Sequence, residues 1–461
     1  MQYWACSASR RHPRRSTLQV KRSSTRPRFE VTVDTRNTVN HAGSAGLVEL
    51  ADKIGLTKGW SQAMAKTRSR RSAHDPGRVL RDLVVMLADG GDCLTDLSAM
   101  RDQPDLFGQV ASTPTAYRVI DSIGPQQLEG LREARRLARS RAWKMGAAPT
   151  EIVLDFDASL VTAHSEKEGA AGNYKGGFGF HPLFCYLDQS GEALAGLLRS
   201  GNAGANTASD HIEVLAEALR QLPESAHAMP ILARSDSAGA SHDFVDALRE
   251  LEIRFSVGFD LTEPVRQAIL ATPESAWVPA IKQDGQEREG AGVCELVDLD
   301  LECWPSGARA ICRRERPHPG AQLSFTDHNG YRFQVFITDQ TDSDLASLEA
   351  RHRAHARVED RIRCANDTGL ENLPFRDFAA NQVWLELVLA AQDLLVFYQR
   401  LCLEGEARNW EPKKLRYRLL HTVGRMISTG RRHILRLQRN WPWTAVLLGA
   451  FRRLRLLPAI T

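Results

Sequence analysis

The feature that most constrains the fold is a short apolar run that ends in two acidic residues, Asp155 and Asp157. Ile152, Val153 and Leu154 precede the acids, and such a run is typical of a β-strand that is covered on both faces. Because residues i and i+2 of a strand point to the same side, the two carboxylates would repel each other unless a divalent cation lies between them. A strand end whose acids cap a turn explains the same pattern, so residues elsewhere must decide between the two interpretations.

Length and composition indicate a protein with several domains. The chain has 461 residues, of which 43% are hydrophobic, so we expect about two to four domains at roughly 150 residues each. No apolar run approaches the ~20 residues of a membrane-spanning helix, and the first residues lack the apolar segment of a signal peptide. We therefore expect a soluble, cytoplasmic protein with no membrane partner.

Positive charge is concentrated at the two ends of the chain. Before Glu30 there are eight Lys or Arg residues and no acid, and between Arg408 and Arg455 there are thirteen Lys or Arg residues and one acid, Glu411. Two cationic ends favour a polyanionic partner, because each phosphate that a Lys or Arg neutralises releases condensed counterions. A disordered tail whose charge only keeps the protein soluble is the alternative for the N-terminal end.

The N-terminal third is predicted to be a basic arm followed by helices. Residues 1–41 are rich in Arg, Ser, Thr and Pro, which is typical of a flexible arm, and residues 42–148 carry helical periodicity. Gly55 separates two short helical segments in a pattern like a helix-turn-helix, whose second helix, 58–66, would contact a DNA groove. Two packed helices without a DNA role explain that pattern equally well. The last helix carries five arginines that predict a solvated face, or one that contacts a DNA backbone: Arg132, Arg135, Arg136, Arg139 and Arg141.

Residues 149–261 are predicted to form a mixed α/β core. After the first strand, the pattern indicates a hairpin over 181–198, a helix over 210–221, and a second strand that also ends in an acid, Asp236. A further helix and strand follow. Ligands of such sheets bind beyond the carboxyl ends of the strands, where Asp157 and Asp236 both fall.

A third acid, Glu359, follows a segment that interrupts the alternation of strands and helices. Residues 262–340 contain short β-like fragments between turns and are predicted to be an inserted β-subdomain, after which residues 341–400 return to helix. Glu359 falls on the face of this helix that Leu348 and Ile362 predict to be apolar. An inward carboxylate must be paired, protonated or bound to a metal, and the neighbouring arginines offer an ion pair as the alternative.

Three carboxylates in this order, Asp157, Asp236 and Glu359, resemble the DDE transposases, and more closely the bacterial insertion-sequence family numbered thirteen-eighty within the insertion-sequence-four-like clan. The similarity runs from about residue 47 to the end. The matching segments are Leu154-Asp-Phe-Asp-Ala-Ser, Leu198-Arg-Ser-Gly-Asn202, Ala233-Arg-Ser-Asp-Ser237, Arg357-Val-Glu-Asp-Arg-Ile362 and Phe375-Arg-Asp-Phe-Ala-Ala-Asn-Gln-Val-Trp384.

The resemblance implies a fold class and a reaction. The fold would be an α/β RNase H-like mixed sheet with the inserted β-subdomain, a helical DNA-binding domain before it and a basic helical region over 401–461 after it. The three acids would be catalytic and would bind two Mg²⁺ ions, which Mn²⁺ can replace, with Asp157 rather than Asp155 bridging them. The reaction would be cutting and joining of phosphodiester bonds at the ends of an insertion sequence.

The resemblance also implies partners and DNA contacts. The partner would be double-stranded DNA, as terminal inverted repeats and target, held by a homodimer or larger multimer in the bacterial cytoplasm near the nucleoid. The expected DNA contacts are Arg199, Asn202, His352, Arg353, His355, Arg357, Lys413, Lys414 and Arg416. The sequence departs from the family where His352, His355 and Asn366 replace Tyr, Arg and Lys. The alternatives are a non-catalytic regulator derived from a transposase, and a nuclease on the same core that does not join strands.

Overall fold

A computed structural model describes residues 36–68, 73–317, 327–430 and 432–458 of the chain. The chain divides into two units, Met1–Arg36 and Asn37–Thr461, and every element described below belongs to the second. Most of the basic arm predicted over 1–41 lies outside the described residues. Its last part is ordered, because Thr38–Val39 form strand β1. In the described part of the chain, no helix is both long and apolar enough to cross a membrane.

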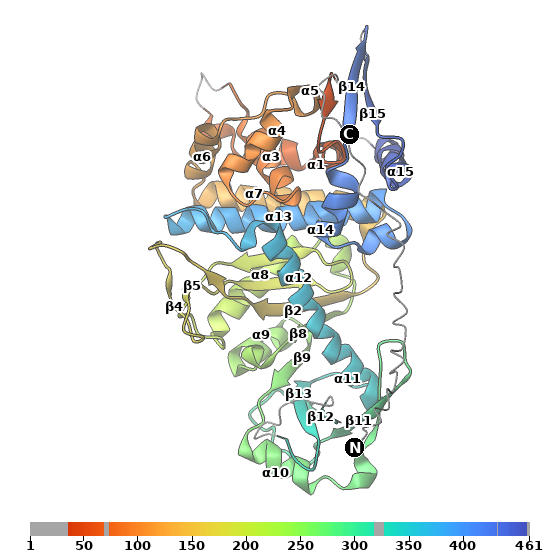
Figure 1. Cartoon of the computed structure of the whole chain (residues 1–461). Helices are drawn as coiled ribbons and strands as arrows, with labels where there is room; N and C mark the ends of the chain where they lie inside the picture. Colours follow the sequence, from red (N-terminus) through yellow and green to blue (C-terminus); the bar gives the residue numbers. More distant parts are fainter. Residues whose placement is uncertain (1–35, 69–72, 318–326, 431, 459–461) are drawn as a thin grey trace, which may run out of the picture. The chain divides into compact units, whose positions relative to one another are not determined.

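A mixed sheet organises the second unit (Figure 1). Its nine described strands follow the order β10-β11-β12-β13-β9-β8-β2-β6-β7. Strand β8 is parallel to both β2 and β9, and the other neighbours are antiparallel. The strands are β2 (Ile152–Ala158), β6 (Leu183–Leu187), β7 (Ala193–Leu197), β8 (Ile231–Ser235), β9 (Arg254–Phe259), β10 (Val278–Ile281), β11 (Glu287–Glu295), β12 (Arg309–Glu315) and β13 (Arg332–Thr338). The prediction of a mixed α/β sheet in the central region is confirmed.

The inserted strands do not form a separate sheet. Strand β13 pairs antiparallel with β9, from Val335 opposite Phe259 to Thr338 opposite Ser256, so β10 to β13 extend the central sheet. The β-subdomain predicted as an insertion over 262–340 therefore continues the central sheet through β9. The physical reason is that β9 would otherwise leave a row of unpaired backbone groups at the sheet edge. The insertion keeps a small apolar cluster of its own, which includes Val293, Ile311 and Phe336.

Helices surround the sheet and form the N-terminal region. The main ones are α1 (Ala45–Lys53), α2 (Leu56–Ala63), α3 (Pro76–Ala88), α6 (Thr113–Asp121), α7 (Pro125–Ala142), α8 (Ala208–Gln221), α9 (His242–Glu250), α10 (Glu263–Ala271), α11 (Leu345–Arg353), α12 (Arg357–Ala365), α13 (Phe378–Cys402) and α15 (Thr444–Leu456). Gly55 separates α1 from α2 with a φ of 79°, a left-handed conformation that glycine adopts readily. Helix α13 contacts β7 of the sheet and also α1, α3 and α7, so it joins the helical region to the sheet (Figure 1).

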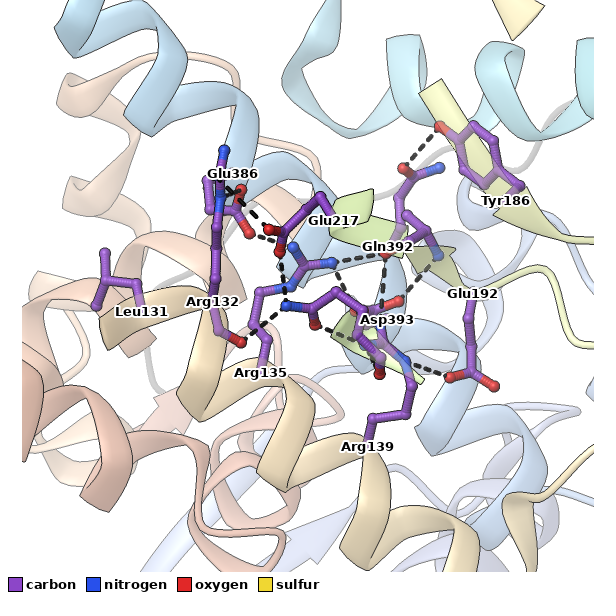
Figure 2. Close-up of polar contacts among 12 residues, drawn as sticks. Leu131, Arg132, Arg135, Arg139, Tyr186, Glu192, Glu217, Glu386, Gln392 and Asp393 are labelled. Carbon is purple, nitrogen blue, oxygen red and sulfur yellow. Dashed lines mark hydrogen bonds and ion pairs between the residues drawn. The ribbon is translucent and has the colours of Figure 1, made fainter. Parts of the chain in front are cut away.

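A buried ionic network fastens α7 to this joint (Figure 2). Arg139 is fully buried and donates from Nε to Glu192 at 2.7 Å and from Nη2 to Asp393 at 2.5 Å. Arg135 donates to the same Asp393 oxygen at 2.9 Å and also pairs with Glu386. The prediction that the arginines of this helix form a solvated face is wrong for these two. Helical periodicity alone does not reveal the carboxylate partners of these arginines. Glu192 lies in the turn before β7, and Glu386 and Asp393 lie on α13.

The C-terminal region is not helical throughout. Strands β14 (Gly424–Thr429) and β15 (Arg432–Leu437) form an antiparallel hairpin, and β1 pairs with the base of β14. The prediction of a wholly helical region over 401–461 is wrong here. The pairing of Ile427 with Ile434 and the positive φ of Gly430 at the turn explain the hairpin, because β-branched pairs favour strands and glycine accepts that φ.

Candidate active site

Asp157 is the last acid of β2, and it lies in a half-buried position beside two other carboxylates. Burial, together with the negative charges of Asp236 and Glu359, raises the pKa of Asp157 to about 6, against the opposite effects of His355 and of the Ala158 N–H. That N–H donates to Asp157 Oδ1 at 2.7 Å. Because only nearby charges act in this way, the three predicted acids lie within electrostatic reach of one another.

Asp236 comes beside Asp157 through the pairing of two parallel strands. The last register pair of β2 and β8 is Phe156 with Ser235, and each acid is the next residue of its strand. Asp236 is exposed, and its carboxylate accepts a hydrogen bond from the Ala238 N–H at 3.0 Å, which holds the turn after β8. Parallel pairing thus carries both carboxylates to the same edge of the sheet.

Glu359 reaches the same edge from α12, but its side chain is exposed. The prediction that it faces the apolar core is wrong. A short 3-10 segment, Ala354–Ala356, separates α11 from α12 and interrupts the spacing of 3.6 residues per turn. Val358 and Ile362 are therefore the buried residues of α12, while Glu359 lines an open cavity together with Asp236.

This cavity has a volume of about 730 Å³ and lies between the carboxyl ends of β8 and β9, strand β13 and the helices α11 and α12. Its basic side chains include Arg288, Arg313 and Arg353. Arg288 pairs with Glu315, and Arg353 donates to Glu349 at 2.8 Å. The cavity is large enough for a part of a polar substrate next to two of the three acids.

Asp155 is held differently from Asp157 although both leave β2 on the same side. Its two carboxylate oxygens accept hydrogen bonds from Arg234 at 2.7 and 2.8 Å, and His355 Nδ1 lies 3.1 Å from Oδ1. Only 1% of Asp155 is exposed. The Arg234 guanidinium therefore occupies this carboxylate, and Asp157 alone of the pair faces the other two acids.

Arg234 is a residue that the sequence interpretation missed. It lies in the middle of β8, is 1% exposed, and also pairs with Asp188 at 3.0 Å. The available signal was an arginine inside an otherwise apolar strand, because a buried guanidinium needs carboxylate partners. Together with His355, it forms the polar layer beneath the three acids.

Three of the residues predicted to contact DNA are engaged by other parts of the protein. Arg199 is 5% exposed and pairs with Asp210 at 3.1 Å. Arg416 is 7% exposed and donates to the backbone oxygens of Ala88 and Asp367. His352 stacks on the Phe336 ring at 4.2 Å, and burial sets its pKa well below the ordinary value.

The other predicted contacts are more accessible, and most have a partner. Arg357 pairs with Asp188 at 2.9 Å while half of its side chain stays exposed, and Lys413 pairs with Asp367 at 2.7 Å. Lys414 lies 5.7 Å from the centroid of the Trp410 ring. Asn202 is exposed in the loop after β7, whereas Arg353 and His355 are half-buried beside the acids.

Among the described residues, two groups of possible metal ligands have ligand atoms that all lie within 4.8 Å of one another: His41, Asp89 and His421, and Asp92, Cys93 and Asp96. In the first group the side chains already satisfy one another, since His41 Nδ1 lies 2.5 Å from Asp89 Oδ2 and Ser44 donates to Oδ1 at 2.6 Å. Neither group includes any of the three acids predicted from the sequence.

One comparison with known proteins identifies a family. A family model described as "Transposase DDE domain group 1" matches residues 21–459. A search of curated proteins finds no match. Among solved structures, the chain is similar to a piggyBac transposase synaptic complex with hairpin DNA, determined by cryo-EM, with a TM-score of 0.42 and 10% sequence identity over 84% of this chain and 81% of that chain.

Proposed function

The chain belongs to the group 1 family of transposase DDE domains, and from this premise we propose that it cuts and joins DNA at the ends of an insertion sequence through Asp157, Asp236 and Glu359. The observations that support this choice of residues are that Asp157 and Asp236 follow the paired strands β2 and β8, and that Asp236 and Glu359 line one cavity. The three acids disfavour a purely regulatory protein, because such a protein has no need of three mutually repelling carboxylates.

The arrangement of the central strands supports an RNase H-like core. Three antiparallel strands, in the order β7-β6-β2, are followed by β8 and β9, which run parallel to β2. In such a core the first and fourth strands are neighbours, so the acids at their ends lie side by side. Strands β10 to β13 then correspond to the insertion that precedes the helix of Glu359.

The three acids also fit a divalent metal. Their oxygens are hard ligands of the kind that Mg²⁺ and Mn²⁺ accept, and burial together with the charges of Asp236 and Glu359 raises the pKa of Asp157. Asp157, Asp236 and Glu359 would hold the metal. When bound, the metal would supply Lewis-acid stabilisation of the phosphoryl oxygens and an activated water.

The remaining side chains position this centre. The Asp155 and Arg234 pair fixes the end of β2, and His355 lies against Asp155 while its charge opposes that of Asp157. Asn202 and Arg357 remain as accessible groups that would contact DNA phosphates.

We further propose that the hairpin of β14 and β15 contacts duplex DNA. Arg425, Arg432 and Arg436 are exposed and project from one face of the hairpin, since opposite residues of an antiparallel pair share a face. From Pro412 to the end of the chain the sequence contains no Asp or Glu. A two-stranded ribbon fits the major groove of B-DNA, so the hairpin would hold transposon ends or target DNA. A homodimer or larger multimer would bring two ends together.

The experiment is strand cleavage by an Asp236→Asn variant. Asparagine keeps the hydrogen bond to the Ala238 N–H, so the turn should fold, but it loses the charge that binds a metal. We expect cleavage of a plasmid that carries cognate ends to fall by at least about a thousandfold, because several kcal/mol of transition-state stabilisation are removed.

The matched control is Asp246→Asn, which neutralises an exposed acid of α9 and should cut normally. Metal-dependent cutting by Asp236→Asn at the wild-type rate would refute the assignment. Assays with two labelled ends separate joining from cutting, and cutting without any joined product would favour the nuclease.

A further inference from the structure

A second cavity, of about 490 Å³, lies on another face of the helix that carries Glu359. Arg357, Arg361 and Cys364 of α12 line it, and their spacing of four and three residues places them on one face of the helix. The rest of the wall comes from Gly146, from the turn between β6 and β7, from α13 and from the segment 408–412, which includes Trp410 and Glu411. The cavity shares none of its residues with the site of the three acids.

Five arginines line this cavity, and only two of them are neutralised. Arg357 pairs with Asp188, and Arg363 pairs with both Asp360 and Glu411. Arg361, Arg400 and Arg408 have no carboxylate within ion-pair distance in the described part of the chain, and their hydrogen bonds go to backbone oxygens of Asp188, Gln189, Leu403 and Arg400. Three guanidinium charges therefore remain around one cavity.

The charges of Arg361 and Arg408 act on Arg400. Burial lowers the pKa of Arg400, and the charges of Arg361 and Arg408 lower it further, against the attraction of Glu192. Like charges that face one space destabilise each other unless an anion lies between them. The protein itself therefore does not supply enough negative charge to balance the arginines around this cavity.

Hydrogen-bond donors in the same wall are also unsatisfied. Arg361 Nε and Trp410 Nε1 are buried and have no acceptor, and Trp410 is only 5% exposed. Gly191, with a φ of 77°, lies directly against the Arg361 guanidinium, where a Cβ atom would come within 2.7 Å of it. The Arg361 guanidinium is therefore held in place while its Nε–H has no acceptor. Buried donors without acceptors are energetically unfavourable.

We propose that this cavity binds a phosphate group, which supplies the negative charge and the acceptor oxygens that Arg361, Arg400, Arg408 and Trp410 lack. Guanidinium groups match the geometry of phosphate oxygens and bind them in pairs of hydrogen bonds. The phosphate comes either from the backbone of bound DNA or from a free phosphorylated molecule. The first source rests on the proposed function, and the second does not.

The test measures binding by the full-length chain without divalent metal, so that no DNA is cut and catalysis plays no part. The probes are inorganic pyrophosphate, by calorimetry, and a labelled duplex, by anisotropy. We expect pyrophosphate to bind the wild type, and Arg361→Gln to weaken that binding by about tenfold or more, since a charge-assisted pair is lost.

Arg361→Lys keeps the charge and the fold but loses the planar fork, and should weaken pyrophosphate binding by a smaller factor. The control is Arg266→Gln, an exposed arginine of α10 that pairs with Glu263, and it should bind as the wild type does. No pyrophosphate binding by the wild type, or equal binding by the wild type and both Arg361 variants, would overturn the proposal.

The duplex separates the two sources of phosphate. If pyrophosphate competes with the duplex and Arg361→Gln weakens both, the cavity holds a backbone phosphate. If Arg361→Gln weakens only pyrophosphate binding, the cavity takes a free phosphorylated molecule. Either result stands even if Asp236→Asn were to retain cleavage, because this experiment measures binding alone.

Discussion

Two acids that are equivalent in the sequence pattern have different environments at the residue scale. Asp155 is held by Arg234 and His355, whereas Asp157 faces Asp236 and Glu359 without a comparable cation. Removing one partner of a buried ion pair strongly destabilises the folded protein. Neutralising a carboxylate that lies among other carboxylates does not cause such a loss. The two acids should therefore respond in opposite ways to the same substitution.

We expect Asp155→Asn to lower the free energy of unfolding by about 3 kcal/mol, because it leaves the buried Arg234 with an incomplete partner. Asp157→Asn should abolish cleavage and stabilise the metal-free protein above pH 6. The sign follows from the pKa of Asp157, which folding raises from 3.8 to about 6, so its ionisation opposes folding as the pH increases between these values.

Urea unfolding without divalent metal, followed by circular dichroism from pH 4 to pH 8, measures both effects. The difference between Asp157→Asn and the wild type should shrink as the pH falls from 6 toward 4, because the folded and unfolded wild type approach the same protonated state there. A free energy of unfolding that falls, relative to the wild type, as the pH rises in Asp157→Asn would contradict the assigned environment of this acid.

At the scale of single elements, α7 shows how one helix mixes structural and solvated arginines. Arg139 is fully buried between Glu192 and Asp393, while Arg136 on the same helix is partly exposed and pairs with the exposed Glu133 three residues earlier. Since α13 contributes Glu386 and Asp393, the network ties the N-terminal helices to the sheet. Disrupting this network should therefore lower the free energy of unfolding of the protein.

We expect Arg139→Ala to lower the free energy of unfolding by about 3 to 5 kcal/mol, because it leaves two buried carboxylates without their cation. Arg136→Ala is the matched control on the same helix, and it should change stability by less than about 1 kcal/mol, as exposed pairs do. Chemical denaturation of both variants measures the contrast. Equal losses would mean that the buried network contributes little beyond helix propensity.

At the scale of the whole molecule, positive charge lies in several places with different roles. Arg199 and Arg416 are buried and structural, the cavity behind α12 gathers unpaired arginines, and the hairpin of β14 and β15 exposes others. Net charge and charge density in the sequence do not distinguish these roles. Exposure does, because only an accessible cation can exchange counterions with a DNA phosphate.

Substitution of the hairpin arginines should therefore change the salt dependence of DNA binding. For the double variant Arg425→Gln and Arg436→Gln, we expect the slope of log K against log salt to fall in magnitude by about 2, since each lost phosphate contact contributes about 0.9. Fluorescence anisotropy with a duplex at several salt concentrations measures the slope. The double variant Arg118→Gln and Arg266→Gln removes the same charge from exposed positions on other helices and should leave the salt slope unchanged. An unchanged slope in the hairpin variant would exclude the hairpin as a DNA contact.

The sequence by itself determined which residues could matter for catalysis. Apolar runs that end in Asp157 and Asp236 predicted two strand ends, because strand burial and charge placement are properties of local sequence. The match of the family model supports the class that the order of the three acids suggested. The identity of the third acid came from that resemblance, while the reason first given for it, an inward-facing side chain, was wrong.

Only the tertiary structure decided how those residues are used. The pairing of Arg234 with Asp155, the exposure of Glu359 and the burial of Arg199 and Arg416 all depend on partners distant in the sequence. The same is true of the insertion, which extends the central sheet, and of the unpaired arginines behind α12. Periodicity reports which side of an element is apolar, but the charge that faces a side chain comes from other elements, and only folding brings them together.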